Sequence, residues 1–170
     1  MASNQHALED GNGRSSDWIE IYNSGDDAAD MTGWFLTDDS ADLDQWRFPS
    51  IQIDPGAFLI VFASGTDIYQ YIDQSGSPHT SFKLSAGGES IALVRPDLTV
   101  AQQVDFSQQY PDISFGFAFP ELTEQGYFSQ ATPGSPNGPL RNSVTRDAVS
   151  ASHESGAFTQ PFALELTTAA

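Results

Sequence analysis

The sequence contains no cysteine among its 170 residues. Disulfide bonds, thiolate nucleophiles and metal sites built on cysteine are therefore excluded. No apolar run approaches the roughly 18 residues that a membrane helix needs, and no basic stretch followed by an apolar one opens the chain. We therefore expect no membrane insertion, and this sequence carries no visible export signal.

Basic residues are also scarce. Lysine and arginine together number 6 against 23 aspartates and glutamates, which gives a formal net charge of −17. A surface of this sign repels nucleic-acid phosphates and anionic lipids. We therefore expect no nucleic-acid binding by this chain alone. The acidity is compatible with calcium or with salty surroundings and establishes neither.

Aromatic residues, in contrast, are plentiful: 12 Phe, 5 Tyr and 3 Trp, within a hydrophobic content of 39%. This is enough to build a core, and it argues against a disordered acidic tail. The pattern contains seven or eight short alternating segments, separated by Gly/Pro-rich turns at intervals of about 8–15 residues. No long helical period is present, although residues 67–71 could form one helical turn. The sequence thus predicts an all-β sandwich or barrel.

Residues 17–49 form the segment on which the fold prediction mainly depends. Apolar and polar residues alternate over residues 17–23, which indicates a half-buried strand. Two further strands are expected on either side of a polar turn, the second ending at Pro49, which cannot donate a ladder hydrogen bond. All three tryptophans lie here, and we expect Trp34 to be buried between the sheets.

The later strands are expected over residues 57–63, 100–106 and 114–119. Residues 57–63 are apolar on both faces, which is typical of a central strand covered on both sides. Residues 81–97 read as a hairpin that turns at Gly87 and Gly88, with Phe82 and Leu84 on one arm. Ile91 and Leu93 would point inward on the other arm.

The order of these motifs resembles the bacterial form of the lamin tail domain. The resemblance runs from about Met1 to Asn137 and implies an immunoglobulin-like β-sandwich of about 7–8 short strands. The strand that opens this family is missing before Met1, so we expect the chain to be a piece of a longer protein. The matching signature residues, all implied to be structural, are Trp18, Asn23, Gly33, Trp34, Trp46, Phe48, Pro49, Gly87, Gly88, Gly116, Pro133 and Gly134.

Three segments are expected along the chain: a lamin-tail-like sandwich over residues 1–137, a polar linker over 138–156, and a fragment of a following β domain over 157–170. The last segment is similar to the opening strand of a chitobiase/β-hexosaminidase C-terminal-type module. Its strand at residues 162–166 either packs back onto the sandwich or stays detached, and we favour detachment.

The resemblance implies a non-catalytic interaction or tethering module within a larger secreted or surface bacterial protein. Its partner would be a protein or an extracellular polymer, and its location extracellular or at the cell surface. The alternative is a carbohydrate-binding module whose exposed aromatic faces would be Trp18 with Tyr22 and Trp46 with Phe48. Core packing is the competing interpretation of these same residues.

The sequence offers little chemistry. It has no nucleophile elbow, phosphate loop or zinc-protease motif, and His6, His79 and His153 are isolated in polar segments. We therefore expect no enzyme and no cofactor, with calcium the one open possibility. The candidates for calcium are Asp38, Asp39, Asp42 and Asp44, with a similar acidic turn at Asp26, Asp27 and Asp30; a solvated turn is the favoured reading of both.

Overall fold

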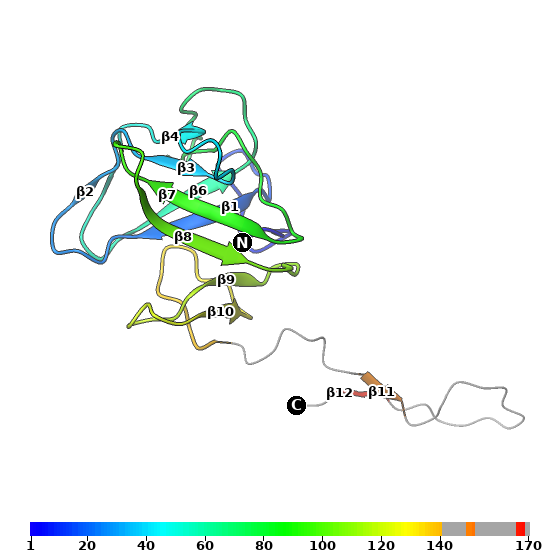
Figure 1. Cartoon of the computed structure of the whole chain (residues 1–170). Coiled ribbons are helices and arrows are strands. Elements are labelled where there is room, and N and C mark those ends of the chain that lie inside the picture. The colour runs from blue at the N-terminus through cyan, green and yellow to red at the C-terminus, as the bar shows by residue number, and fades with distance from the viewer. Residues whose placement is uncertain (141–148, 152–165, 169–170) are drawn as a thin grey trace, which may run out of the picture.

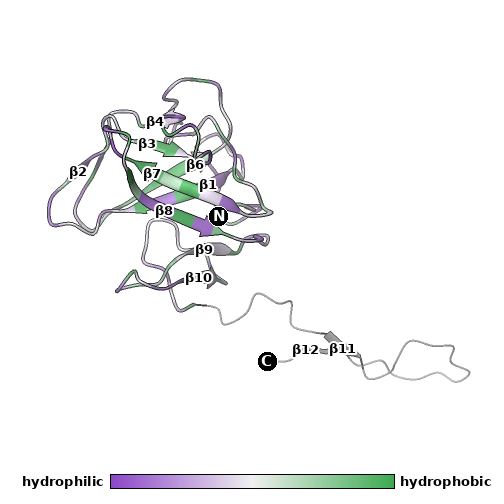
Figure 2. Cartoon of the chain, in the orientation of Figure 1, coloured by the Kyte–Doolittle hydropathy of each residue, from purple (hydrophilic) through white to green (hydrophobic). Residues whose placement is uncertain are grey.

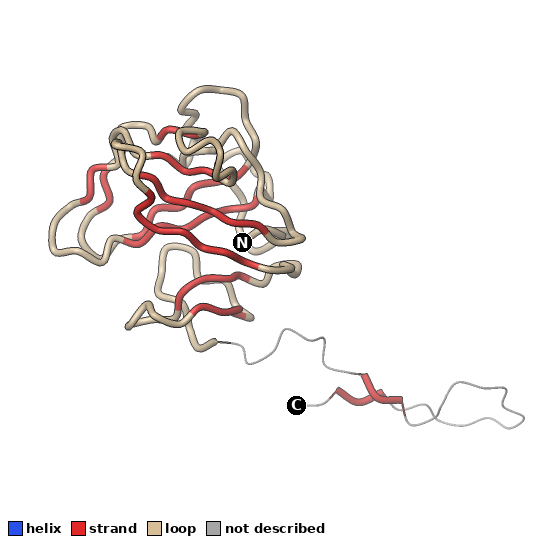
Figure 3. Tube along the Cα trace, viewed as in Figure 1, coloured by secondary structure: helices blue, strands red, loops and turns tan. Residues whose placement is uncertain are grey.

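The computed structural model describes residues 1–140, 149–151 and 166–168. These residues form strands, loops and turns, and no helix occurs among them (Figure 3). Accordingly, none of the described residues belongs to a helix long and apolar enough to cross a membrane. The helical turn expected at residues 67–71 is instead an irregular turn. The strands are β1 (Asp17–Tyr22), β2 (Ala29–Asp30), β3 (Phe35–Thr37), β4 (Trp46–Arg47), β5 (Gln52–Ile53), β6 (Phe58–Ala63), β7 (Glu89–Val94), β8 (Val100–Phe106), β9 (Ser114–Phe117), β10 (Gln125–Phe128), β11 (Val149–Ala151) and β12 (Leu166–Thr168).

The strands form the two layers of an immunoglobulin-like β-sandwich. One layer is the four-stranded sheet β4-β3-β7-β8, and the other contains the pairs β1-β6 and β2-β5. All named pairs are antiparallel, with Trp18 opposite Phe62 in β1-β6 and Leu36 opposite Leu93 in β3-β7. Figure 1 shows β1 and β6 crossing the four-stranded sheet, with the β9-β10 hairpin beside β8. The fold class predicted from the sequence is confirmed.

The core lies between the two layers. Val61 of β6, Leu36 of β3 and Ile91 of β7 meet there with exposed fractions of 0%, 2% and 9%. Burying a side chain of this size stabilises the fold by about 1.5–3 kcal/mol relative to leaving it exposed. Figure 2 shows the hydrophobic residues gathered along β3, β6 and β7, while the connecting loops are largely hydrophilic.

The hairpin predicted over residues 81–97 does not form. The chain from Pro78 to Lys83 bonds instead to the far edge of β6: Phe62 N–H donates to Pro78, and Thr80 N–H donates to Phe62. β6 is thus paired along both edges of its second half, as expected of a covered strand. β7 belongs to the other layer, where it pairs with β3 and β8. Phe82 and Leu84 are buried. Their alternation therefore reflects contact with the core, although the segment does not form a hairpin.

The prediction for Trp34 is wrong. Trp18 and Trp46 are the buried tryptophans, at 4% and 5% exposure, whereas Trp34 is half-buried at the margin of the core. Its ring instead lies beneath the Arg95 guanidinium, whose carbon is 5.9 Å from the ring centroid. One face of the Trp34 ring therefore makes a cation–π contact with Arg95.

Residues 1–16 form no strand but are closely packed. The Asn4 side-chain amide donates to the carbonyls of Leu8 and Ser16, at 2.6 and 2.7 Å. One carboxylate oxygen of Asp112 accepts backbone N–H groups from residues 5, 6 and 7. The loop expected from the sequence is thus anchored to distant parts of the chain.

Beyond Asn137 the described residues are few. Leu140 packs on Gly126 of β10, because a Cβ at that glycine would lie 2.8 Å from a Leu140 methyl group. β11 falls within the expected linker and pairs with β12, Ala151 opposite Leu166. The expected strand at residues 162–166 lies, apart from Leu166, outside the described residues, so its docking or detachment stays a prediction, as do the segment boundaries.

Candidate functional site

A cleft of about 450 Å³ opens between β1, the outer strand β8 and β9 with the loop that follows it. Tyr22 of β1, Val104 of β8 and Phe115 of β9 line its three sides. Its volume falls within the range of ligand pockets, which is about 300–1,000 Å³. The cleft is therefore the candidate functional site.

One end of the cleft is an aromatic cluster. The Tyr22 ring lies 4.7 Å from Phe58 and 4.9 Å from Phe119, measured between ring centroids, and Phe58 and Phe119 are 5.7 Å apart. All three rings line the cleft and are only half-buried. They therefore offer apolar surface to a ligand without needing to rearrange.

Two buried polar groups at the cleft have no hydrogen-bond partner among the described residues. They are the indole Nε1 of Trp18 and the hydroxyl of Ser114, on residues exposed by only 4% and 5%. Leaving such a group unpaired costs about 1–3 kcal/mol. Both atoms have almost no solvent-accessible surface, so they lie behind the lining of the cleft and not on its open surface.

The cleft also contains one carboxylate, that of Glu20. Its oxygen accepts the N–H of Gly134 at 2.7 Å. Burial raises the pKa of the Glu20 carboxyl, although the bond from Gly134 opposes that shift. A cation placed beside Glu20 would favour its charged form, so the cleft combines an apolar wall with a site for positive charge.

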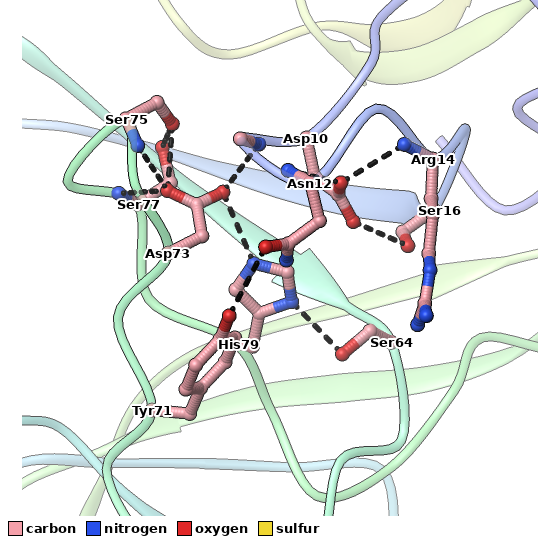
Figure 4. A network of polar contacts seen from close by, with 11 residues as sticks. Asp10, Asn12, Arg14, Ser16, Ser64, Tyr71, Asp73, Ser75, Ser77 and His79 are labelled. Carbon is pink, nitrogen blue, oxygen red and sulfur yellow. Dashed lines mark hydrogen bonds and ion pairs between the residues drawn. The ribbon is translucent and has the colours of Figure 1, made fainter.

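A second group of polar side chains, around His79, lies beside β6 (Figure 4). His79 is 2% exposed; its Nε2 is 3.2 Å from the Asp73 carboxylate and its Nδ1 is 2.9 Å from the Ser64 hydroxyl. No pattern in the sequence indicates this cluster, because its members come from separate loops and a strand end. No motif spacing links them.

Ser64, His79 and Asp73 are the residue types of a hydrolytic triad, but the arrangement does not meet the other requirements of one. A triad needs a base open to substrate, whereas the His79 ring is enclosed by Phe62 and Tyr71, at 5.3 and 5.1 Å between centroids. Asp73 is also committed to other donors, including Gly11 N–H at 2.6 Å. We therefore interpret the cluster as a structural tie between the N-terminal loop and the segment that borders β6.

The other predicted histidines lie apart from these sites. His6 is exposed in the N-terminal loop, where its backbone N–H donates to Asp112. His153 lies outside the described residues.

The acidic turn between β3 and β4 is organised by uncharged groups. The Thr37 hydroxyl donates within the turn, and the Gln45 side-chain oxygen accepts the backbone N–H of Asp38 at 3.0 Å. Partial desolvation, followed by the charges of Asp44 and Asp39, raises the pKa of Asp42. Asp39, Asp42 and Asp44 are exposed and Asp38 is half-buried. Within the described ranges, no three histidines, aspartates or glutamates are placed to hold a metal ion.

The second acidic turn is organised by Asn23, whose amide donates to the carbonyls of Asp27 and Ile53, both at 2.8 Å. Asp26, Asp27 and Asp30 are exposed. Asp30 caps its own turn by accepting the Thr32 N–H, and hydrogen bonds from Thr32 lower its pKa. The signature asparagine thus has a structural role.

The aromatic faces proposed for sugar binding are closed. Trp18, Trp46 and Phe48 are 4%, 5% and 1% exposed, and the Trp46 and Phe48 rings pack edge to face at 4.7 Å. Of the four aromatics proposed, Trp18 and Tyr22 line the cleft, and Tyr22 is the one that is half-buried and not buried.

Other signature residues shape turns and close contacts. Gly33, Gly88 and Gly134 have positive φ angles of 84°, 103° and 75°, which favour glycine. A Cβ on Gly116 would lie 3.5 Å from the Asn137 amide, so β9 carries its small residue where the closing segment crosses. Pro49 is buried, Pro133 is half-buried, and Gly87 is exposed.

Comparison with known proteins agrees with this geometry. No curated protein and no solved structure matches the sequence. A family model, described as Lamin Tail Domain, matches residues 5–108. That match covers more than half of the 170 residues and includes β1 to β8. The chain therefore belongs to the lamin tail domain family.

Proposed function

We propose that the chain is a non-catalytic module that binds a protein partner through the cleft between β1, β8 and β9. The observation that supports this most directly is the half-buried ring cluster of Tyr22, Phe58 and Phe119, which lines the cleft. Interaction domains of the immunoglobulin-like class carry function in such grafted sites rather than in the fold itself.

A protein partner suits the cleft better than a glycan does. Sugar platforms present flat exposed rings, and the Trp18 and Trp46 rings are buried. The cleft instead offers ring faces together with an acidic group, which fits a segment that carries apolar and basic side chains. Polysaccharide binding remains the second outcome of the test.

The test compares two ligand sets on the same 170-residue chain. Extended peptides with apolar and basic residues are titrated against it by NMR, alongside cello- and chito-oligosaccharides. We expect peptides to shift the resonances of the cleft residues and sugars to shift none. Sugar binding at the cleft without peptide binding would contradict the proposal.

Two single substitutions test whether the peptide binds in the cleft. Phe119→Ala removes one ring of the cluster and should weaken peptide binding at least about tenfold, since an aromatic anchor is worth more than 1.4 kcal/mol. Tyr69→Ala is the matched control, because Tyr69 is 73% exposed and lies outside the cleft. Equal loss in both variants would contradict binding in the cleft.

We further propose that the module belongs to a larger extracellular or cell-surface protein and tethers it to its partner. The strongly acidic surface supports this, since it disfavours nucleic acid and anionic lipid as partners. Residues 157–170 would begin a following β domain. The complete open reading frame tests both statements, because it would reveal an export signal and the neighbouring domains.

A further inference from the structure

Three large apolar side chains are exposed close together in the loop that follows β6. Ile68, Tyr69 and Ile72 are 57%, 73% and 42% exposed, and they are three of the five large hydrophobic residues exposed in the described part of the chain. Single exposed apolar side chains are ordinary, whereas a group of them marks an interaction surface. We call residues 66–72 the apolar loop.

The apolar loop is held in place by hydrogen bonds. The Gln70 side-chain amide donates to the Phe48 carbonyl at 2.8 Å, and the His79 N–H donates to the Tyr71 carbonyl at 3.0 Å. Directly after the loop, the Asp73 carboxylate joins the buried cluster around His79 (Figure 4). A loop that is already ordered loses little conformational entropy when it binds a partner.

The apolar loop lies apart from the cleft. β1 pairs with one edge of β6, while the segment from Pro78 to Lys83 bonds to the other edge. The loop adjoins that second segment, because the Thr66 N–H donates to the Thr80 carbonyl at 3.1 Å. No residue of the apolar loop lines the cleft.

The surface around the apolar loop carries little net charge. Asp67, Asp73 and Lys83 are the charged residues between positions 55 and 88 of the sequence, and Asp73 is buried. Lys83 lies beside the start of the loop, because a Cβ on Gly65 would be 2.9 Å from the Lys83 Cγ. It therefore offsets the charge of Asp67. Depletion of charged residues is characteristic of the core of a protein interface.

We propose that the apolar loop is a contact surface between two copies of this chain, which pair about a two-fold axis. A basic partner would be drawn to the acidic surface elsewhere on the molecule, whereas another acidic protein can approach closely only where the charge is low. A second copy is such a protein, and a two-fold axis brings identical patches together. Ile68 and Tyr69 of one copy would pack against the same residues of the other. This pairing goes beyond the proposed function and does not depend on it.

Sedimentation velocity of the 170-residue chain tests the pairing. Three apolar side chains per copy make a small contact, so the dimer should be weak and should grow in between about 10 µM and about 1 mM protein. Sodium chloride should strengthen it, because screening relieves the repulsion between two chains of net charge −17. We expect the dissociation constant to fall at least about threefold between about 0.1 M and about 0.5 M salt. A rise instead would indicate a contact built on opposite charges and would overturn the proposal.

Substitutions place the contact. Ile68→Ser combined with Tyr69→Ser should weaken the dimer at least about tenfold, since tyrosine is a frequent interface anchor. Leu98→Ser is the matched control, because Leu98 is 46% exposed but lies in the turn between β7 and β8. It should pair like the native chain, as should the cleft variant Phe119→Ala. An equal loss in Leu98→Ser, or loss of the dimer in Phe119→Ala, would overturn the assignment to the apolar loop.

A mixture of isotope-labelled and unlabelled chain provides a direct check. Contacts between copies, detected by filtered NMR, should involve Ile68 and Tyr69. A chain that stays monomeric at about 1 mM in about 0.5 M salt would overturn the proposal. A monomer that sediments with phosphatidylcholine vesicles, and loses this property when Ile68 and Tyr69 are replaced by serine, would identify the loop as a lipid contact instead.

Discussion

Asp73 is a buried carboxylate held by hydrogen bonds. Two N–H groups and one hydroxyl, from Ser75 and Ser77, reach one of its oxygens, while Gly11 and His79 reach the other. Burial alone would raise the pKa of Asp73, but these hydrogen bonds outweigh it and hold the pKa well below the usual range. The charged form is therefore part of the folded structure.

Asp73→Asn should lower the free energy of unfolding by about 2–4 kcal/mol at neutral pH, because an amide places donors where the loop already supplies donors. Urea unfolding measures the loss. Asp54→Asn is the control: Asp54 is exposed, and its replacement should stay within about 0.5 kcal/mol. Equal effects of the two substitutions would contradict the role of Asp73.

The same site predicts a pH dependence. The folded pKa of Asp73 lies below its unfolded value of about 3.9. Its stabilisation is thus present above that value and is lost as the pH falls through the folded pKa. The difference in unfolding free energy between the native chain and Asp73→Asn should shrink from about pH 5 to about pH 2. A constant difference would mean that the carboxylate charge is not responsible.

Removal of the different tryptophans should lower the free energy of unfolding by different amounts. Trp46→Ala empties a site that is 5% exposed and should cost about 3–5 kcal/mol. Trp34→Ala removes a half-buried ring and its Arg95 contact and should cost less than about 2 kcal/mol. Urea melts of the two variants give the order, and a larger loss at Trp34 would contradict it.

At the scale of strands, local alternation predicted well where a strand is half-buried, as in β1 and β9. It failed at Phe82 and Leu84, because these residues are buried while their segment bonds to β6 instead of β7. Alternation reports which side chains face a core, but it does not report which strand supplies the backbone partner. Pairing between distant segments therefore had to come from the structure.

The candidate sites were hidden from sequence for the same reason. The cleft is assembled from β1, β8 and β9, and β1 is separated from the other two strands by some 80 to 100 positions in the sequence. The aromatic run at residues 115–119 was visible as a strand, but its lining of a cleft was not. His79 lies in a polar segment, and its burial depends on contacts with Asp73 and Ser64 that no local pattern encodes.

Gly88, which leads into β7, gives a prediction for the strand pair β7-β8. Its φ is +103°, and an added Cβ would lie 2.7 Å from the Phe106 carbonyl oxygen at the end of β8. Gly88→Ala should therefore cost more than about 2 kcal/mol. Gly56 also has positive φ but nothing within 4 Å, so Gly56→Ala should cost only about 1–2 kcal/mol. Thermal or urea unfolding that ranks the two in the opposite order would contradict this reading of the turn.

For the whole molecule, charge should govern the response to salt. A net charge of −17 makes the folded chain repel itself, and the screening length falls from about 10 Å at 0.1 M salt to about 3 Å at 1 M. The urea midpoint should therefore rise with sodium chloride over this range. A falling midpoint would show that attractive pairs outweigh the repulsion.

Calcium separates general screening from binding. At equal ionic strength, calcium and magnesium should stabilise the chain to the same extent, as expected for solvated acidic turns. Saturable stabilisation by micromolar calcium without a magnesium equivalent would identify the turn of Asp38, Asp39, Asp42 and Asp44 as a binding site instead.

The anchoring of the N-terminal loop by Asp112 has a consequence for the order of events during synthesis. The three N–H groups that this carboxylate accepts lie 105 to 107 residues earlier in the chain. A ribosome adds roughly 5–20 residues per second, so the loop waits several seconds or more before its anchor emerges. Residues 5–7 therefore reach these native contacts only after more than 100 further residues have been made, and a nascent chain halted before Asp112 would carry them exposed to proteases and chaperones.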